Sequence, residues 1–257
     1  FDNDGNAKST FTGSLPAAPQ SGSMNGAIGS MIPLGRPEGM KFYENIDNKD
    51  SQGLVGANYD QAIALMANQD DYRYNVISVP GLIKANAAQG SQITTLVNNC
   101  VSRGDAMAIV DLVNYNTAIN TVTVQAAGFD SSYAATYWPW VRVVDANTSE
   151  LVYVPASTVI PGVYAFTDST SDPWFAPAGI TRGGLSVVNA ERRLTVGNRD
   201  TLYEANVNPI ATFPGQGVVV FGQKTLQKKA SALDRVNVRR LLIALKSYIV
   251  QISDNLV

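Results

Sequence analysis

The stretch LVYVPASTVIPGVYAFTDSTSDPWFAPAGITRGG, which runs from Leu151 to Gly184, decides how this chain folds, and we call it the hub segment. Its prolines are Pro155, Pro161, Pro173 and Pro177. Proline interrupts helices and removes a hydrogen-bond donor from sheets, so regular structure is not expected to run through the segment. Large apolar side chains such as Trp174 and Phe175 nevertheless need burial. The sequence therefore predicts an ordered, packed and irregular connector.

Two of these prolines frame the aromatic pair of the hub segment. Because Pro173 and Pro177 restrict the backbone, we expect the rings of Trp174 and Phe175 to insert into the core of the domain that the segment crosses. Gly179 completes this predicted structural hub. Its missing side chain permits either a positive φ angle or close packing, and the sequence leaves both roles open.

Three further motifs flank the hub segment in a fixed order. They read YWPWVRVVD (137–145), NPIATFPGQGVVVFGQKTL (208–226) and DRVNVRRLLIALKSYI (234–249). Together with the hub segment they resemble the contractile tail-sheath proteins of bacteriophages. The four ordered motifs cover roughly half of the chain, and their order makes the resemblance specific although no single motif would be enough.

The resemblance implies an α/β core in which helices flank a central sheet, with a subtilisin-like architecture but no catalytic site. Hydrophobic periodicity supports this fold class. Apolar residues alternate over 74–79, repeat at helical spacing over 88–103 and run almost continuously over 106–113. Strand, helix and strand in this order predict a βαβ unit, and Gly104 supplies the stop signal of the helix.

Further elements follow from the same patterns. We expect helices at 59–66 and 198–206, strands at 133–144 and 217–221, and a turn at Pro80 and Gly81. The segment 116–130 fits either a strand or a helical face, and the resemblance favours the helix. Trp138 and Trp140 lie on one face of the strand at 133–144, where a core or subunit contact is favoured over a sugar or base platform.

The last helix follows Ser231 and carries one apolar stripe, which we expect to cover a surface that lies outside the chain as given. The stripe contains Val238, Leu241, Leu242, Leu245, Ile249, Ile252 and Leu256. The polar side chains predicted to face away from it are Arg239, Arg240, Lys246 and Gln251.

Residues 1–37 are rich in Gly, Ser, Ala, Asn and Pro and cannot bury enough apolar surface to form a core. We interpret them as a linker or as the end of an inserted outer β-rich domain, which the resemblance implies. Residues 38–257 are predicted to form the α/β core. Because the chain begins with Phe1 and the apolar stripe continues to its end, we expect a fragment that lacks an N-terminal arm and a C-terminal domain.

Composition argues against an enzyme. The chain contains no histidine and neither a G-x-S-x-G nor an S-x-x-K motif, so no Ser-His-Asp site or obvious substitute is available. The single cysteine, Cys100, excludes an internal disulfide and a cysteine-based zinc site. No cofactor site and no metal site are predicted.

Carboxylates offer the one catalytic alternative. Paired acids can hydrolyse a sugar, and the candidates are Asp70, Asp71, Asp105 and Asp111. Asp111 interrupts an apolar strand near its carboxyl end, where open α/β sheets place their ligands. We favour a structural role in which Asp111 caps the next turn or pairs with an arginine.

Charge is divided unequally along the chain. Residues 182–246 contain 11 basic and 4 acidic side chains, whereas residues 1–181 contain 8 basic and 16 acidic ones. No recognition-helix, RNP or zinc motif supports nucleic-acid binding, so we favour contacts in which the basic region of one copy meets the acidic region of another. The candidate contact residues are Arg192, Arg193, Lys228 and Lys229 on the basic side and Asp47, Asp50, Asp70 and Asp71 on the acidic side.

The resemblance implies a structural protein of the virion tail that is assembled in the host cytoplasm. Copies of it would polymerise helically around the tail tube, meet the baseplate and the tail terminator, and contract to drive the tube through the host cell envelope. The chain as given is expected to be monomeric, because the resemblance implies terminal arms that add strands to neighbouring subunits.

Two alternatives remain open for the function. One is the sheath of a bacterial contractile injection system, and the other, in a different class, is a carboxylate-dependent tail depolymerase. No apolar run approaches the ~20 residues of a membrane-spanning helix, so membrane insertion is not expected.

Overall fold

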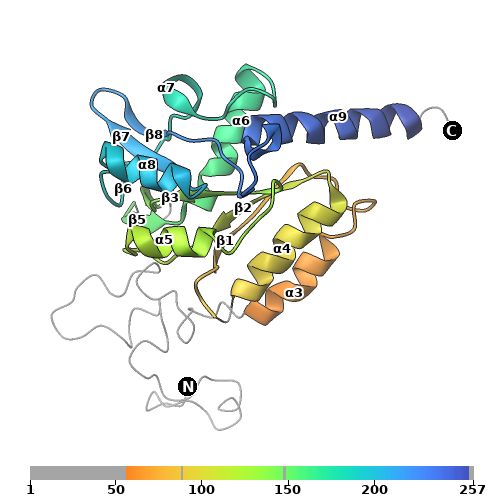
Figure 1. Ribbon diagram of the computed structural model, residues 1–257, viewed down its shortest axis with the longest axis horizontal. Coiled ribbons are helices and arrows are strands. Elements are labelled where there is room, and N and C mark those ends of the chain that lie inside the picture. The colour runs from red at the N-terminus through yellow and green to blue at the C-terminus, as the bar shows by residue number, and fades with distance from the viewer. Residues whose placement is uncertain (1–55, 88, 147–148, 255–257) are drawn as a thin grey trace, which may run out of the picture. The chain divides into compact units, whose positions relative to one another are not determined.

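A computed structural model of the protein describes residues 56–87, 89–146 and 149–254 (Figure 1). The chain divides into two units, Phe1–Leu54 and Val55–Val257, and the described helices and strands belong to the second. The predicted boundary between a linker at 1–37 and a core at 38–257 lies outside the described residues. None of the helices in the described ranges is long and apolar enough to cross a membrane.

A central sheet of five strands organises the second unit, in the order β1-β2-β3-β7-β8. The strands are β1 (Val76–Ile83), β2 (Met107–Asp111), β3 (Ala134–Trp138), β7 (Asn208–Phe213) and β8 (Gly217–Val220). The first four are parallel to their neighbours, and β8 returns antiparallel to β7. A sheet of parallel strands is stable in water only when both of its faces are covered.

Two core clusters of buried side chains cover the two faces of the central sheet. On one face lie α3 (Gly56–Leu65), α4 (Gly90–Arg103), α5 (Ile119–Ala126) and α8 (Val196–Glu204), and on the other lie α6 (Ile160–Thr170) and the first turns of α9 (Val236–Asp254). Alternation along β2 divides its side chains between them. Ala108 and Val110 belong to the first cluster, whereas Met107 and Ile109 belong to the second.

The βαβ unit predicted from periodicity is confirmed. β1 and β2 are parallel and α4 connects them, with Leu96 and Cys100 of α4 buried in the first cluster. Gly104 ends the helix in the left-handed conformation, at φ 67°. The helix predicted within 116–130 is also present as α5. The α/β fold with a central sheet and flanking helices is therefore correct.

The turn predicted at Pro80 and Gly81 is wrong, because β1 continues through both residues to Ile83. The register with β2 shifts between Ser78 and Ile83, so these residues form an irregularity within the strand. Gly81 has φ 98°, a conformation that residues with a Cβ rarely adopt.

The single strand predicted at 133–144 is two strands in two sheets. β3 belongs to the central sheet, whereas β4 (Val141–Val144) is the middle strand of a small antiparallel sheet with β5 (Leu151–Val154) and β6 (Asn189–Ala190). Pro139 lies between β3 and β4 and follows a cis peptide bond. Trp138 and Trp140 are both buried, and the Trp140 indole N–H donates to the Val113 carbonyl at 3.0 Å. Of the predicted alternatives for this pair, a core role is correct.

The prediction of an irregular hub segment is wrong for much of its length. After β5 the chain forms the 3-10 helix η2 (Ala156–Thr158), then α6, and later the short helix α7 (Gly179–Arg182). Pro161 is compatible with α6 because it lies in the first turn, where a backbone N–H would have no helical partner. The prolines therefore mark where elements begin and do not prevent them.

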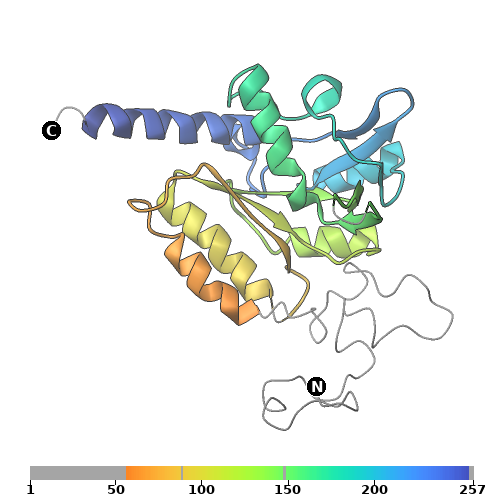
Figure 2. The same ribbon diagram turned by 180° about the vertical axis from the view of Figure 1, so that it is seen from behind.

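The prediction for Arg239 and Arg240 of the last helix is also wrong. The first turns of α9 bury Arg239 and Arg240, which were expected to face away, whereas Leu242, Leu245 and Ile249 of the apolar stripe are exposed. The reason is that each guanidinium group has a partner on another element, Ser132 for Arg239 and Asp168 for Arg240, so burial does not follow hydropathy here. Beyond Lys246 the described side chains of α9 are exposed, and the helix extends past the elements that hold its beginning (Figure 2).

Candidate functional site

The acidic side chains do not form a metal centre in the described part of the chain, where no group of three or more His, Cys, Asp or Glu is placed to hold an ion. Asp105 is ion-paired with Arg103, with 2.9 Å between Oδ1 and Nε. Asp70 and Asp71 are exposed in the turn after α3, where Asn68 bonds to both residues. Burial raises the pKa of the Cys100 thiol to about 12, which keeps it protonated and unreactive. The candidate functional sites are therefore surfaces.

The aromatic pair of the hub segment is part of such a surface. Trp174 is 44% exposed and Phe175 is 40% exposed, so the prediction that their rings insert into the core is wrong. The physical reason is that the segment is anchored by other groups. Asn237 of α9 donates to the Trp174 carbonyl at 3.3 Å, and the Arg182 guanidinium stacks over the Phe175 ring.

The other members of the predicted hub fix the backbone around this pair. Pro177 is buried and Pro173 is half-buried, and Gly179 has φ 85°. The positive φ identifies the first of the two roles that the sequence left open for this glycine. Two more large apolar side chains on the adjoining helices are exposed, Phe166 on α6 and Ile180 on α7. We call Phe166, Trp174, Phe175 and Ile180 the aromatic surface.

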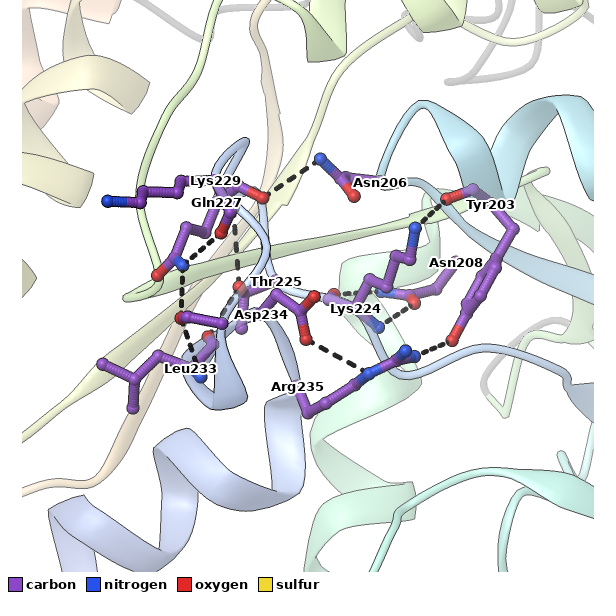
Figure 3. A network of polar contacts seen from close by, with 11 residues as sticks. Tyr203, Asn206, Asn208, Lys224, Thr225, Gln227, Lys229, Leu233, Asp234 and Arg235 are labelled. Carbon is purple, nitrogen blue, oxygen red and sulfur yellow. Dashed lines mark hydrogen bonds and ion pairs between the residues drawn. The ribbon is translucent and has the colours of Figure 1, made fainter.

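A second candidate surface is the loop that carries Lys228 and Lys229, both of which are exposed. Polar contacts hold the backbone of this loop from within (Figure 3). Gln227 donates from Nε2 to the Lys229 carbonyl at 2.6 Å, and Asn206 donates to the Gln227 carbonyl at 3.2 Å. The Lys228 backbone N–H donates to Asp130 at 2.9 Å. Figure 3 shows the Lys229 ammonium pointing away from the network.

Asn208 of β7 ties the same loop to the central sheet. Its amide donates to the carbonyls of Thr136 and Lys224 at 3.0 and 2.8 Å, and its Oδ1 accepts from the Lys224 backbone at 2.6 Å. Asp234 and Tyr203 both contact Arg235 at the end of the loop (Figure 3). The loop is therefore a rigid platform for two exposed lysines. In the described residues neither lysine has an ion pair with a carboxylate.

The remaining predicted contact residues differ in how strongly their own subunit holds them. Arg192 is ion-paired with Glu191 at 2.8 Å and stacks over Trp138, which makes it a poorer contact candidate than Arg193, which is exposed. Asp70 and Asp71 are exposed and remain predicted contact residues. Asp47 and Asp50 lie outside the described residues.

The contacts of the buried arginines at the base of α9 were not predicted from the sequence. Arg240 makes an ion pair with Asp168 of α6 at 2.6 Å and stacks over Tyr164, whose hydroxyl bonds to the Tyr137 hydroxyl at 2.6 Å. Arg239 bonds to Ser132 and lies over the Tyr133 ring. The available signal was spacing, because Val236, Arg240 and Ile243 follow one helical face.

Beyond this base, a groove of about 730 Å³ separates α9 from the turn after α3. Its walls include Asp70 and Tyr74 on one side and Ile243, Lys246 and Tyr248 on the other. The Lys246 ammonium donates to the Arg103 carbonyl at 2.5 Å and so connects α9 to the end of α4.

Asp111 is buried at the end of β2 and accepts two hydrogen bonds from Ser157 of η2. Asp111 therefore has a structural role, but the favoured expectation that it caps the next turn or pairs with an arginine is wrong, because its partner is 46 residues away in sequence. The sequence indicated only that Asp111 interrupts an apolar strand, and it did not identify Ser157 as the partner.

A family model described as the phage tail sheath protein central domain matches residues 53–226. The tail sheath protein of Vibrio phage KVP40 is 36% identical over 161 residues, which cover 58% of this chain and 23% of that protein. The tail sheath protein of Enterobacteria phage T4 is 36% identical over 143 residues, which cover 55% of this chain and 22% of that protein. The chain thus spans less than a quarter of the length of these relatives.

Solved structures of contractile systems share the fold. A chain of the contracted helical sheath of the anti-feeding prophage matches with a TM-score of 0.58 at 24% identity, over 79% of this chain and 53% of that one. A chain of the contracted baseplate of the same system matches with a TM-score of 0.63 at 17% identity, over 79% and 56% of the two chains. At these identities the likeness concerns the fold.

Proposed function

Because this chain belongs to the family of the phage tail sheath protein central domain, we propose that it is part of a structural subunit of a contractile tail sheath. Copies of the subunit polymerise helically around a tail tube and contract to drive that tube through the host cell envelope. The observation that carries the proposal is the family match over residues 53–226, which covers most of the described α/β unit.

The exposed surfaces support this proposal in physical terms. Contacts between two different patches on identical subunits produce an open helix when the rotation between subunits does not close. The residues of the aromatic surface and the platform of Lys228 and Lys229 lie on different elements and are all exposed, and polar contacts hold the backbone of the lysine platform. Contraction is then a rigid-body rearrangement in which subunits exchange one set of contacts for another.

The proposed partners follow from the same function. They are copies of the subunit itself, the tail tube protein, the baseplate and the tail terminator, and the proposed place of assembly is the host cytoplasm. The mature subunit belongs to the virion tail. The proposed subunit is a mechanical component and not an enzyme.

A second candidate within the same architecture is the sheath of a bacterial contractile injection system. The structural likeness to chains of the anti-feeding prophage supports it, whereas the higher sequence identity to tail sheath proteins of phages supports the first candidate. A tail depolymerase has less support, since Asp105 is engaged by Arg103 and Asp111 is buried against Ser157.

Electron microscopy of the full-length parent protein after overexpression tests the proposal. Hollow tubes or stacked rings are expected. Dispersed particles that hydrolyse host polysaccharide would contradict the sheath function and favour the depolymerase.

A further inference from the structure

One buried contact joins the central sheet to the beginning of α6. Asp111 is the last residue of β2, and Ser157 lies in η2 directly before α6. The Ser157 hydroxyl donates to Asp111 Oδ2 at 2.5 Å, and the Ser157 backbone N–H donates to Oδ1 at 3.2 Å. Asp111 is 5% exposed and Ser157 is 1% exposed, so the whole contact is removed from water.

Cationic groups near Asp111 are directed elsewhere in the described part of the chain. Lys84 follows β1 and gives its backbone N–H to the Asp111 carbonyl, but its ammonium donates to Gly90 and Thr94 of α4. At the other end of α4, Arg103 is engaged by Asp105.

The titratable groups on the other neighbouring elements are engaged as well. On β3 the Tyr137 hydroxyl bonds to Tyr164. Trp140 lines the same small cavity as Asp111, and its backbone N–H donates to Glu191. Glu191 is in turn ion-paired with Arg192. A carboxylate at position 111 would therefore be a buried anion that two hydrogen bonds stabilise and that no ion pair with a described residue neutralises.

We propose that Asp111 and Ser157 form a proton-sensitive latch between the central sheet and the η2–α6 segment. With the carboxyl protonated, the proton lies on Oδ2 and is donated to the Ser157 hydroxyl oxygen across the same contact, so the closed contact buries no net charge. When the proton passes to solvent, the closed contact holds an anion in an apolar setting, which favours release of η2 and the first turn of α6 toward water. The latch is closed at acidic pH and weakened at neutral and higher pH.

The protonation behaviour of Asp111 agrees with this geometry. Burial raises the pKa of its carboxyl to about 7, while the two hydrogen bonds from Ser157 act in the opposite direction. The open segment exposes the carboxyl to water, where its pKa returns to the ordinary range. The opening equilibrium therefore increases as pH rises from about 4 to about 7 and is constant above that range, since only between the two pKa values does opening release a proton.

The latch connects to the rest of the molecule through α6. The same helix carries Asp168, whose ion pair with Arg240 holds the base of α9. Opening at η2 thus acts on the element that positions α9, which is a direct physical connection and does not depend on the proposed sheath function.

Amide hydrogen exchange of the 257-residue chain, corrected for intrinsic rates, tests the latch. Between pH 5 and 6 the opening of residues 157–164 should increase by about tenfold, and the increase should level off through pH 7 to a plateau near pH 8. Asp111→Asn keeps the shape of the side chain but carries no titrating proton, and it should make the opening of this segment independent of pH. Amides of α3 serve as the internal reference and should be equal in both proteins.

Two results would overturn the latch. One is an equal pH dependence of residues 157–164 in Asp111→Asn, and the other is exchange of this segment at the rate of the β3 amides, which would mean that it opens only by global unfolding. A direct titration avoids reliance on the variant's folding. The Asp111 carboxyl carbon, followed by NMR in the wild type, should titrate near pH 7, and a midpoint near pH 4 contradicts the proposal.

Discussion

At the scale of single residues, Trp174 shows that framing by prolines does not ensure burial. Pro173 and Pro177 fix the backbone, yet the indole ring is presented at the surface because Asn237 and Arg182 hold the segment from the side. An exposed tryptophan on rigid backbone loses little conformational entropy when it is buried in a contact, which is why such residues are frequent at protein interfaces.

Trp174→Ala should therefore change the stability of the chain only slightly. Substitutions at exposed sites usually change the free energy of unfolding by about 0.5 kcal/mol or less, whereas truncation of a buried aromatic costs about 3 to 5 kcal/mol. The matched control is Trp138→Ala, which removes a buried ring of the same type. Urea denaturation measures the free energy of unfolding of both variants and so compares the two sites. A large loss of stability in Trp174→Ala would show that the ring belongs to the core.

Burial of Asp111 predicts how stability depends on pH. Because its pKa is raised in the folded state to about 7, the folded protein binds this proton more tightly than the unfolded chain. The contribution of this proton to the free energy of unfolding is fully present below the unfolded pKa near 4 and is lost as pH rises through 7. In this range the free energy of unfolding falls by up to about 1.4 kcal/mol per pH unit. Burial also raises the pKa of Glu191, which acts in the same direction.

Urea denaturation of the wild type between pH 5 and 8 should therefore show lower stability at the higher pH. Asp111→Asn should reduce this slope without removing it, because Glu191 still titrates. A wild-type stability that increases with pH over this range would contradict the assignment.

At the scale of elements, α9 is held by charge pairs at its base and presents apolar side chains farther along. Arg240 is 4% exposed and depends on Asp168, so removal of that carboxylate leaves a buried guanidinium without its counter-charge. The Lys246 contact with the end of α4 is the second attachment. The position of the helix is thus set by polar contacts more than by its apolar stripe.

Asp168→Asn should destabilise the chain by up to about 3 kcal/mol, since breaking a buried ion pair costs more than the pair contributes. It should also increase amide exchange in the first turns of α9. Asp172→Asn is the matched control, because Asp172 lies nearby and makes no ion pair with a described residue. Equal unfolding free energies for the two variants would show that the ion pair does not hold α9.

The elements that could be predicted from the sequence are those in which hydropathy decides burial. The β1–α4–β2 unit and α5 follow from apolar spacing and from Gly104 as a helix stop. The position of α6 could not be predicted, because Pro161 looks disruptive unless the helix start is already known. The buried face of α9 could not be predicted from the sequence either, because it depends on Asp168 and Ser132, which are distant in sequence.

In the candidate site, too, features that follow from local hydropathy could be predicted, whereas those that depend on distant partners could not. Asp111 could be singled out because it interrupts an apolar strand, but its partner Ser157 could not be identified from the sequence. Exposure of Trp174 could not be predicted either, because it depends on which neighbours reach the segment. The exposed lysines at 228 and 229 agree with the expected surface position, and their role in contacts between subunits stays a prediction.

At the scale of the whole molecule, the unequal distribution of charge gives copies of the chain a way to recognise each other. A single exposed pair contributes only about 0 to 1 kcal/mol, but a helical polymer repeats each pair at every subunit. Opposite charges on two patches fix orientation and register more than they increase affinity. The platform of Lys228 and Lys229 is suited to this because its backbone is held by Asn208, Gln227 and Asp130.

Reversal of Lys228 and Lys229 to glutamate in the full-length protein should impair tube assembly and leave the subunit folded, because both side chains are exposed. Circular dichroism measures whether the subunit is folded, and sedimentation measures whether tubes assemble. Combination with Asp70→Lys and Asp71→Lys should restore assembly if these are the partners. Normal tubes from the lysine reversal alone would exclude the platform as a contact.

The chain of 257 residues should be monomeric by itself, whereas its full-length parent should polymerise. The resemblance to sheath proteins implies that terminal arms add strands to neighbouring subunits, and main-chain hydrogen bonds of this kind stabilise an assembly strongly. Light scattering at high concentration measures the mass of the chain. A stable hexamer or filament would show that contacts within this part of the protein are sufficient.

The most direct test of the central claim is a helical reconstruction, by electron cryo-microscopy, of the assemblies that the full-length protein forms. The account predicts a hollow tube in which the Val55–Val257 unit repeats as a rigid body, with the aromatic surface or the lysine platform buried against a neighbouring copy. Particles without helical symmetry, or a tube in which both surfaces face solvent, would contradict it.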